Sequence, residues 1–114
     1  MQLNIKSMFI NIKKAVIDLF QNKLHSVILY GSFARGDFDE ESDVDILVVV
    51  NATQEELEKY EPEIAKIASR LSMQTDNCRT ISITLQDYET YHMYKNHLPY
   101  FKNIEKEGAV IYAA

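Results

Sequence analysis

The chain has 114 residues, 46% hydrophobic and 25% charged, which is the size and composition of a single folded domain spanning residues 1–114. Its net charge of −5 argues against general nucleic-acid binding, and its single cysteine, Cys78, excludes an internal disulfide and cannot build a zinc site alone. No stretch approaches the roughly 18 apolar residues of a membrane span, and residues 1–4 begin no signal peptide, so we expect a cytoplasmic protein.

The first part of the chain predicts one helix, one short strand and a tight turn. Apolar residues recur at helical spacing over residues 7–21, and Ser7 is placed to cap this helix. The segment Val27–Tyr30 is short and apolar on both faces, which is typical of a central strand. A helix turn over residues 33–35 follows, and the acidic stretch Asp37–Glu41 forms a solvated loop to the next strand.

The middle of the chain predicts a buried strand followed by a long helix. Residues 43–50 begin with two aspartates and continue as an unbroken apolar run, so only the head of this strand reaches solvent. Thr53 and Glu56 have the spacing of a capping box for a helix over residues 54–73. Pro62 lies inside that helix, where a proline costs about 3 kcal/mol, so we expect a kink or a break in the turn before it.

The last part of the chain predicts two further strands and two helices. Alternating β-branched residues mark a half-buried strand over residues 79–85, and an aromatic-rich helix follows over residues 86–96. A last helix begins around Pro99 and ends at Gly108 in the left-handed conformation, ahead of a short strand over residues 109–112. The predicted fold class is therefore α/β, a small, mixed and twisted sheet of about four strands with helices packed on it.

The head of the strand over residues 43–50 carries a pair of carboxylates suited to a metal ion. Asp43 and Asp45 are two residues apart, so both side chains point to the same face of a strand. Two carboxylates held that close repel each other unless a cation lies between them. Mg²⁺ is a hard, oxygen-preferring ion that takes one or two protein carboxylates and fills its other positions with water and substrate phosphates. We therefore predict that Asp43 and Asp45 are metal ligands and catalytic residues.

The turn after Tyr30 predicts a phosphate-binding element. Gly31 lets the backbone approach a phosphate closely, and the amides that follow it can donate to an anion at a helix N-terminus. Ser32 adds a hydroxyl donor, and Arg35, one turn further on, offers a planar fork to phosphate oxygens. A glycine turn or an aspartate pair alone is usually a tight turn or a solvated strand edge. Together, with apolar runs on both sides, they predict a site for a nucleoside triphosphate and its metal.

The same residues carry a family resemblance. Gly31-Ser32, then ten residues, then Asp43-x-Asp45 resembles the signature of the polymerase-β-type nucleotidyltransferase superfamily. The small size, the run GSFARGDFDEESDVDILVVV and the ending IEKEGAVIY resemble the minimal nucleotidyltransferases. Those are one-domain prokaryotic proteins, many of them antitoxins encoded beside a helical HEPN-type partner. The signature covers 15 residues and is specific, and the wider match is looser.

The chain departs from the family pattern at one point. Complete members of the superfamily carry a third carboxylate on a neighbouring strand, which completes the metal cluster. The strand over residues 79–85 offers Ser82 and Thr84 instead, and neither is a strong Mg²⁺ ligand. Asp76 and Asp87 flank this strand, and either is a candidate for the missing ligand.

Three functions are compatible with the pattern. The resemblance implies a nucleotidyltransferase that uses Mg²⁺ on Asp43 and Asp45, positions the phosphates of ATP on Gly31 and Ser32, and transfers AMP to a tyrosine hydroxyl of a HEPN toxin, as its antitoxin. The missing acid leaves open a binding module that neutralises its partner by occlusion. The third function is transfer to a small-molecule hydroxyl, for which the chain has no extra domain to build a substrate pocket.

Overall fold

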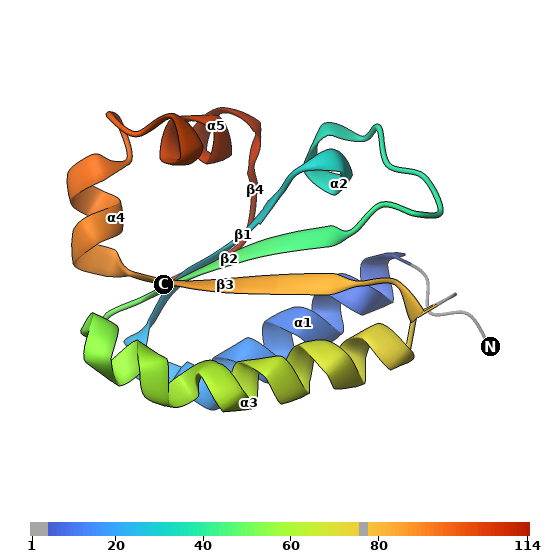
Figure 1. Ribbon diagram of the computed structural model, residues 1–114, viewed down its shortest axis with the longest axis horizontal. Coiled ribbons are helices and arrows are strands. Elements are labelled where there is room, and N and C mark those ends of the chain that lie inside the picture. The colour runs from blue at the N-terminus through green and yellow to red at the C-terminus, as the bar shows by residue number, and fades with distance from the viewer. Residues whose placement is uncertain (1–4, 76–77) are drawn as a thin grey trace.

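The computed structural model describes residues 5–75 and 78–114 (Figure 1). Its helices and strands follow the predicted order, with a 3₁₀ turn added after the first helix. In chain order they are α1 (Ile5–Phe20), η1 (Gln21–Lys23), β1 (Leu24–Tyr30), α2 (Ser32–Arg35), β2 (Val44–Val50), α3 (Gln54–Met73), β3 (Ile81–Asp87), α4 (Tyr88–Tyr94), α5 (Pro99–Glu107) and β4 (Ala109–Ala113). Within these described ranges, no helix is both long enough and apolar enough to cross a membrane.

The four strands form one mixed sheet in the spatial order β3-β2-β1-β4. β1 pairs antiparallel with both β2 and β4, whereas β2 and β3 run parallel. A parallel pair requires a crossover connection, and α3 provides it between β2 and β3. The predicted α/β class with a four-stranded mixed sheet is thus confirmed, as is the prediction that the first strand is central.

Helices cover both faces of the sheet (Figure 1), and the buried side chains form two clusters, one on each face. On β2, Ile46 and Val48 pack with α1 and α3, whereas Leu47 and Val49 pack with α4 and α5. This alternation is the two-residue period of a strand. Because Asp45 has the same phase as Leu47, its carboxylate lies on the α4–α5 face.

The predicted break at Pro62 is wrong, because α3 continues from Gln54 to Met73. Pro62 removes the partner of the Glu58 carbonyl, but both residues are exposed, so water can bond to that carbonyl. The predicted start of the helix is confirmed. Thr53 Oγ1 accepts from the Glu56 amide, and Glu56 Oε1 accepts from the Thr53 amide, each at 3.2 Å. This capping box and the buried apolar face of α3 hold the helix together through the proline.

The last helix ends before Gly108 as predicted, but two details of the predicted helix ends are wrong: Ser7 as the cap of the first helix and the left-handed conformation of Gly108. The first helix extends back to Ile5, so Ser7 lies inside it. Gly108 has φ −70° and ψ 150°, which is extended rather than left-handed. Lack of space explains why residue 108 is glycine. A Cβ there would overlap the Ile104 carbonyl oxygen and lie 2.8 Å from Ile28 Cγ2. Gly108 therefore lets the end of α5 pack directly against β1.

Asp87 is not the missing metal ligand. It is the last residue of β3 and pairs with Val50, at the opposite end of β2 from Asp45. The prediction that it joins the aspartate pair is therefore wrong. Asp76, the other candidate, lies outside the described residues.

Asp87 is instead the N-cap of α4. Its buried carboxylate accepts hydrogen bonds from the Thr90 amide at 2.9 Å and from the side-chain amides of Gln54 and Gln86, each at 3.0 Å. Burial acts to raise the pKa of Asp87, but the hydrogen bonds from Thr90 and Gln54 outweigh it and hold this pKa below its ordinary value. The ionised side chain thus stabilises the junction of β3, α3 and α4.

We expect Asp87→Ala to lower the free energy of unfolding by about 1–3 kcal/mol, because it removes the cap of α4 and the shared acceptor of two partly buried hydrogen bonds, from Gln54 and Gln86. The stability difference between wild type and Asp87→Ala should be largest near neutral pH. It should decrease as the pH falls from about 4 through the lowered pKa of Asp87 in the folded protein. Urea denaturation at several pH values measures this. Glu89→Ala, an exposed change in the same helical turn, is the control, and an equal loss for both variants would contradict the assignment.

Candidate active site

The turn after β1 and the head of β2 meet at one end of the sheet. The two strands are antiparallel, and Tyr30, the last residue of β1, pairs with Asp45. A Cβ added at Gly31 would lie 2.5 Å from Asp45 Oδ2, so the bare glycine packs against the carboxylate. The structure therefore brings the predicted phosphate turn into contact with the predicted metal pair.

The backbone of Gly31 directs the chain from β1 into α2. Its φ of +76° and ψ of −156° fall in a region that is essentially restricted to glycine. The amides of Ala34 and Arg35 both donate to the Gly31 carbonyl at 3.1 Å and close the first turn of α2. No side chain caps this helix, so the amides at its start, beginning with Ser32, are not taken up by a capping residue. Such a turn can receive an anion.

Asp43 and Asp45 stand at the head of β2 in different environments. The strand begins at Val44, one residue later than predicted, so Asp43 lies just before it and is exposed, whereas Asp45 is half-buried. Burial raises the pKa of Asp45, the charge of Asp43 raises it further, and Arg35 lowers it in part. The Asp45 carboxylate is therefore poorly stabilised as an anion on its own, which fits a cation bound between it and Asp43.

The described part of the chain offers this pair without a third acid. Among residues 5–75 and 78–114, no group of three or more His, Cys, Asp and Glu side chains is placed to hold a metal ion. Ser82 of β3 pairs directly with Asp45, and Thr84 follows on the same face of the sheet. A hydroxyl beside Asp45 leaves most positions around a bound Mg²⁺ to water and to substrate oxygens, which is how that ion is usually held.

Arg35 lies at the end of α2, between two acidic side chains. Its Nε donates to Asp37 Oδ2 at 3.2 Å, and its Nη1 donates to Glu107 Oε2 of α5 at 3.4 Å. The hydrogen bond and charge of Asp37, with a smaller contribution from Glu107, raise the pKa of Arg35. Exposed ion pairs of this kind are weak, so the guanidinium can exchange them for phosphate oxygens. Arg35 and Gly31 line the same hollow of about 210 Å³, so both could contact one ligand bound there.

The acidic loop between α2 and β2 is exposed, as predicted, but Arg79 fixes its backbone. The Arg79 guanidinium donates to the carbonyl oxygens of Asp39 at 2.8 Å and Ser42 at 2.6 Å, and it lies 5.0 Å from the centroid of the Phe33 ring. Ser42 immediately precedes Asp43, so Arg79 helps to set the position of that carboxylate. Sequence reasoning missed this role, because Arg79 comes from the segment before β3.

Two tyrosines that the sequence did not connect with the site lie beside Asp45. Tyr30 pairs with Asp45 across β1 and β2, and its hydroxyl is 2.9 Å from that of Tyr100 in α5. The position of Tyr30 at the site could have been predicted from the sequence, because it directly precedes Gly31. Antiparallel pairing of the two strands then places it opposite Asp45. No local signal identifies Tyr100, because only the folding of α5 back onto the sheet brings it there.

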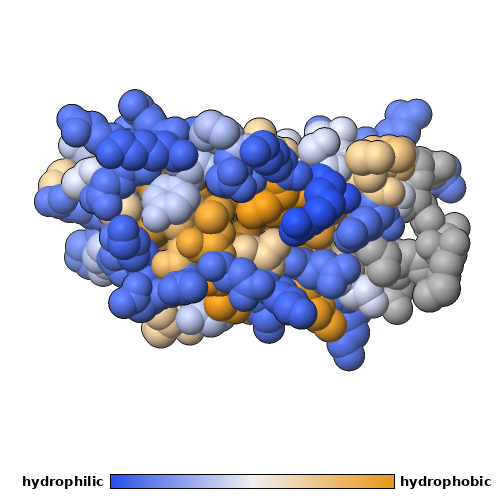
Figure 2. All heavy atoms as spheres, turned by 90° about the horizontal axis from the view of Figure 1, so that it is seen from below, coloured by the Kyte–Doolittle hydropathy of each residue, from blue (hydrophilic) through white to orange (hydrophobic). Residues whose placement is uncertain are grey.

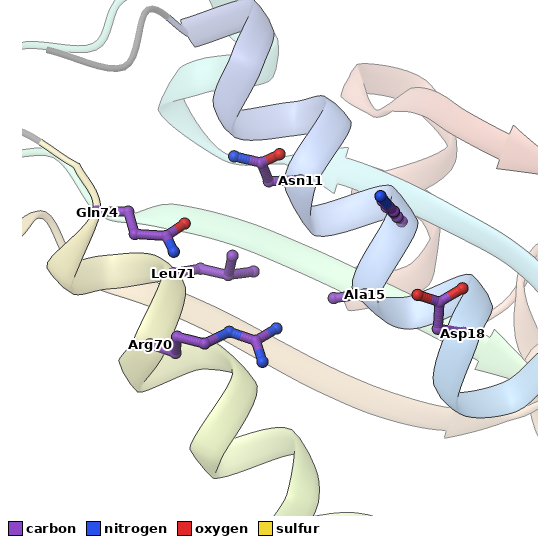
Figure 3. A pocket seen from close by; sticks show the side chains of 7 residues that line it. Asn11, Ala15, Asp18, Arg70, Leu71 and Gln74 are labelled. Carbon is purple, nitrogen blue, oxygen red and sulfur yellow. The ribbon is translucent and has the colours of Figure 1, made fainter.

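A separate hollow of about 300 Å³ lies between α1 and α3 (Figure 3). Figure 2 views the side of the molecule that these helices cover and shows apolar side chains in a groove with hydrophilic ones along its edges. The hollow is lined by Asn11, Lys14, Ala15, Asp18, Arg70, Leu71 and Gln74. It lies on the opposite face of the sheet from Asp45 and includes none of the predicted site residues, so it does not compete with the sheet end as the candidate site.

The sequence is similar to proteins of known family. A family model described as a nucleotidyltransferase domain matches residues 10–112, which include Gly31 and both aspartates. A Methanocaldococcus jannaschii protein named "Putative protein adenylyltransferase" is 50% identical over 64 residues, which are 56% of this chain and 63% of that protein. The matched segment therefore spans less than two thirds of that relative.

Solved structures share the fold. A toxin–antitoxin structure with AMP-PNP has a chain that superposes with a TM-score of 0.60 at 18% identity, covering 93% of this chain and 73% of that one. A Shewanella oneidensis complex of a tri-AMPylated HEPN toxin with an MNT antitoxin gives a TM-score of 0.56 at 16% identity, covering 96% of this chain and 72% of the matched one. At these identities the likeness establishes the fold alone.

Proposed function

The chain belongs to the nucleotidyltransferase domain family, and on this premise we propose that it transfers AMP from ATP to a hydroxyl group of a protein. The observation that carries the proposal is the contact between the Gly31 turn and the Asp45 carboxylate, where an added Cβ would lie 2.5 Å from Oδ2. A triphosphate seated on this turn would present its phosphates to the two aspartates. Phosphoryl-type transfer depends mainly on such positioning and on stabilisation of charge.

Asp43 and Asp45 are the residues that would hold Mg²⁺. Two neighbouring carboxylates, one exposed and one half-buried, fit an ion that takes one or two protein oxygens and completes its shell with water and phosphate oxygens. When bound, Mg²⁺ supplies positive charge against the triphosphate and the departing pyrophosphate. Binding would also relieve the repulsion between the aspartates that helps to raise the pKa of Asp45.

The α2 turn is the element that would hold the phosphates. The amides after Gly31 and the Ser32 hydroxyl are donors for the β- and γ-phosphates. Arg35, one turn later, can leave its exposed pairs with Asp37 and Glu107 and bind a phosphate oxygen in a planar, two-pronged contact. These contacts would orient the α-phosphate toward the incoming hydroxyl and retain the pyrophosphate as it leaves.

The acceptor we propose is a tyrosine hydroxyl of a helical HEPN-type toxin, with this chain as the antitoxin. Two comparisons support the proposal. The Methanocaldococcus jannaschii relative is named as a protein adenylyltransferase, and one structure with the same fold contains an MNT antitoxin bound to a tri-AMPylated HEPN toxin. Adding AMP to the toxin would neutralise it covalently.

Intact-mass analysis of a HEPN-type protein encoded beside this chain tests the proposal. After incubation with the chain, Mg²⁺ and ATP, we expect added AMP units on the partner with wild type and none with the Asp43→Ala/Asp45→Ala double variant. Unmodified partner in a stable, neutralised complex with both proteins would overturn transfer and indicate occlusion.

Ser82→Asp should strengthen the metal site. Ser82 is half-buried and pairs directly with Asp45, so a carboxylate there would extend the acidic pair into a cluster of three. We expect Mg²⁺ affinity, measured by calorimetry or by the Mg²⁺ dependence of transfer, to rise on the order of ten-fold, because cation affinity follows the number of charged ligands. Ser82→Asn has similar size without the charge and should leave the affinity unchanged; a comparable rise in that variant would contradict the explanation.

A further inference from the structure

Tyr30 and Tyr100 bring two phenol groups from distant parts of the chain to the active site. Tyr30 ends the central strand β1, and Tyr100 lies in the first turn of α5. Their hydroxyl oxygens are 2.9 Å apart, and their rings meet edge to face with centroids 5.9 Å apart. The pair forms a wall of the site on the α4–α5 face of the sheet, where Asp45 also lies.

The Tyr100 hydroxyl lies close to the proposed metal ligand Asp45. Its hydrogen-bond partner Tyr30 pairs directly with Asp45 across β1 and β2, and paired residues on neighbouring strands project from the same face of the sheet. The side chain of Tyr100 also interacts with those of Asp45 and Thr84. Thr84 shares the face of Ser82, where β3 runs beside the aspartates, so this phenol approaches the reacting end of the site.

The phosphate turn and the Tyr100 phenol also share one hollow. Gly31, Arg35, Tyr30 and Tyr100 are all among the residues that line the hollow of about 210 Å³ beside α5. A triphosphate held by the turn would thus lie in the same volume as a tyrosine hydroxyl of its own chain.

We propose that Tyr100 is an acceptor for the chain's own transfer reaction, so that the protein adenylylates itself at this hydroxyl. The inference rests on the proposed function, because it uses the same nucleoside triphosphate and the same aspartates. In the step, the Tyr100 oxygen forms a bond to the α-phosphorus of ATP, and the bond from that phosphorus to the bridging oxygen breaks. Pyrophosphate leaves with the electron pair, and the phenolic proton passes to water.

Tyr100 is better suited than Tyr30 to accept the group. Tyr30 ends the central strand and pairs with Asp45 of β2, which restricts the movement of its backbone toward a ligand. Tyr100 is 46% exposed and is the second residue of a short helix, which follows a segment of turns between α4 and α5. Its side chain can therefore pivot about the start of α5 while the sheet keeps Asp45 and Gly31 in place.

The test is incubation of the full chain with Mg²⁺ and ATP labelled on the α-phosphate, with no partner present, followed by peptide mapping. We expect one AMP per chain on the peptide that contains Tyr100, and loss of label to background in Tyr100→Phe. Tyr94→Phe, at an exposed tyrosine of α4, is the matched control and should keep the label. Label that persists in Tyr100→Phe, or that maps to another residue, would overturn the proposal.

Two further experiments distinguish failure of self-modification from failure of the proposed function. The first is a parallel reaction that contains the HEPN-type partner. Labelled partner beside an unlabelled wild-type chain would overturn self-modification but not the proposed function, and no label on either protein would overturn both. A size-tagged Asp45→Asn chain mixed with untagged wild type distinguishes reaction within one chain from reaction between chains. Label on the untagged chain alone is the expected result, and label on the tagged chain would overturn the geometry argued here.

Discussion

Asp45→Asn is expected to abolish metal-dependent transfer while leaving the protein folded. The change keeps the size of a half-buried side chain but removes one of the two charges that would hold Mg²⁺. We expect the rate of AMP transfer to fall by about 10²- to 10³-fold or more, the scale on which removal of one group that stabilises transition-state charge acts. Initial rates of labelled AMP incorporation into the partner measure the loss.

The same variant should be slightly more stable than wild type in the absence of metal. Because burial and Asp43 raise the pKa of Asp45 in the folded protein, ionisation of Asp45 disfavours the folded state. Wild type therefore loses stability as the pH rises from about 4 through this raised pKa, and Asp45→Asn does not. Partial exposure screens the effect, so we expect a few tenths of a kcal/mol at neutral pH.

Glu40→Gln is the matched control for this experiment. Glu40 is exposed in the loop before Asp43, so its change removes one charge from the same region without touching the aspartate pair. It should retain transfer and show no pH-dependent gain in stability. Millimolar Mg²⁺ should raise the melting temperature of wild type and of Glu40→Gln but not of Asp45→Asn, because a ligand stabilises only the folded state that binds it. A normal rate in Asp45→Asn would remove Asp45 from the metal site.

The features that sequence reasoning predicted well are those that neighbouring residues determine. The capping box of Thr53 and Glu56 lies within one turn, and the structure contains it. The apolar run after Asp45 is buried on both faces, so only the head of β2 can carry a polar site. β1 and β2 are adjacent and antiparallel, so the end of β1 lies beside the start of β2. Gly31, which follows β1, therefore lies beside the aspartates at the start of β2.

The features that escaped prediction depend on contacts between distant segments. β3 begins and ends two residues later than predicted, which moves Asp87 from a flanking loop into the strand end and the cap of α4. The residue after α5 is glycine because there is no room for a Cβ beside Ile28, and not because the backbone is left-handed there. The positions of Arg79 and Tyr100 at the site follow only from the packing of β3 and α5, which no local pattern encodes.

Within residues 5–75 and 78–114, no third carboxylate joins the aspartate pair, and side chains with hydroxyl groups lie beside it instead. Ser82 occupies the place beside Asp45, and Thr84 approaches the hydroxyl of Tyr100. A larger acid on this part of β3 would take up room and add negative charge next to the phenols. The site combines two carboxylates with hydroxyl groups, so the proposed transfer would depend on how accurately the Gly31 turn holds the triphosphate against Asp45.

Gly31→Ala is therefore expected to remove most of the transfer activity through geometry alone. The added methyl group would lie 2.5 Å from Asp45 Oδ2, so the carboxylate or the turn must move. The backbone conformation is also one that alanine avoids, at a cost of about 1–3 kcal/mol. We expect transfer to fall by about 10²-fold, since small displacements of positioning groups have effects of this size.

Gly36→Ala separates loss of geometry from loss of stability. Gly36, at the other end of α2, also has a positive φ, of +84°, but a Cβ there meets nothing within 4 Å. This variant should lose about 1–2 kcal/mol from backbone strain, comparable with Gly31→Ala, and yet retain transfer. Denaturation curves and initial rates on both variants provide the comparison. Equal losses of activity would mean that strain in α2, and not the contact between Gly31 and Asp45, governs the reaction.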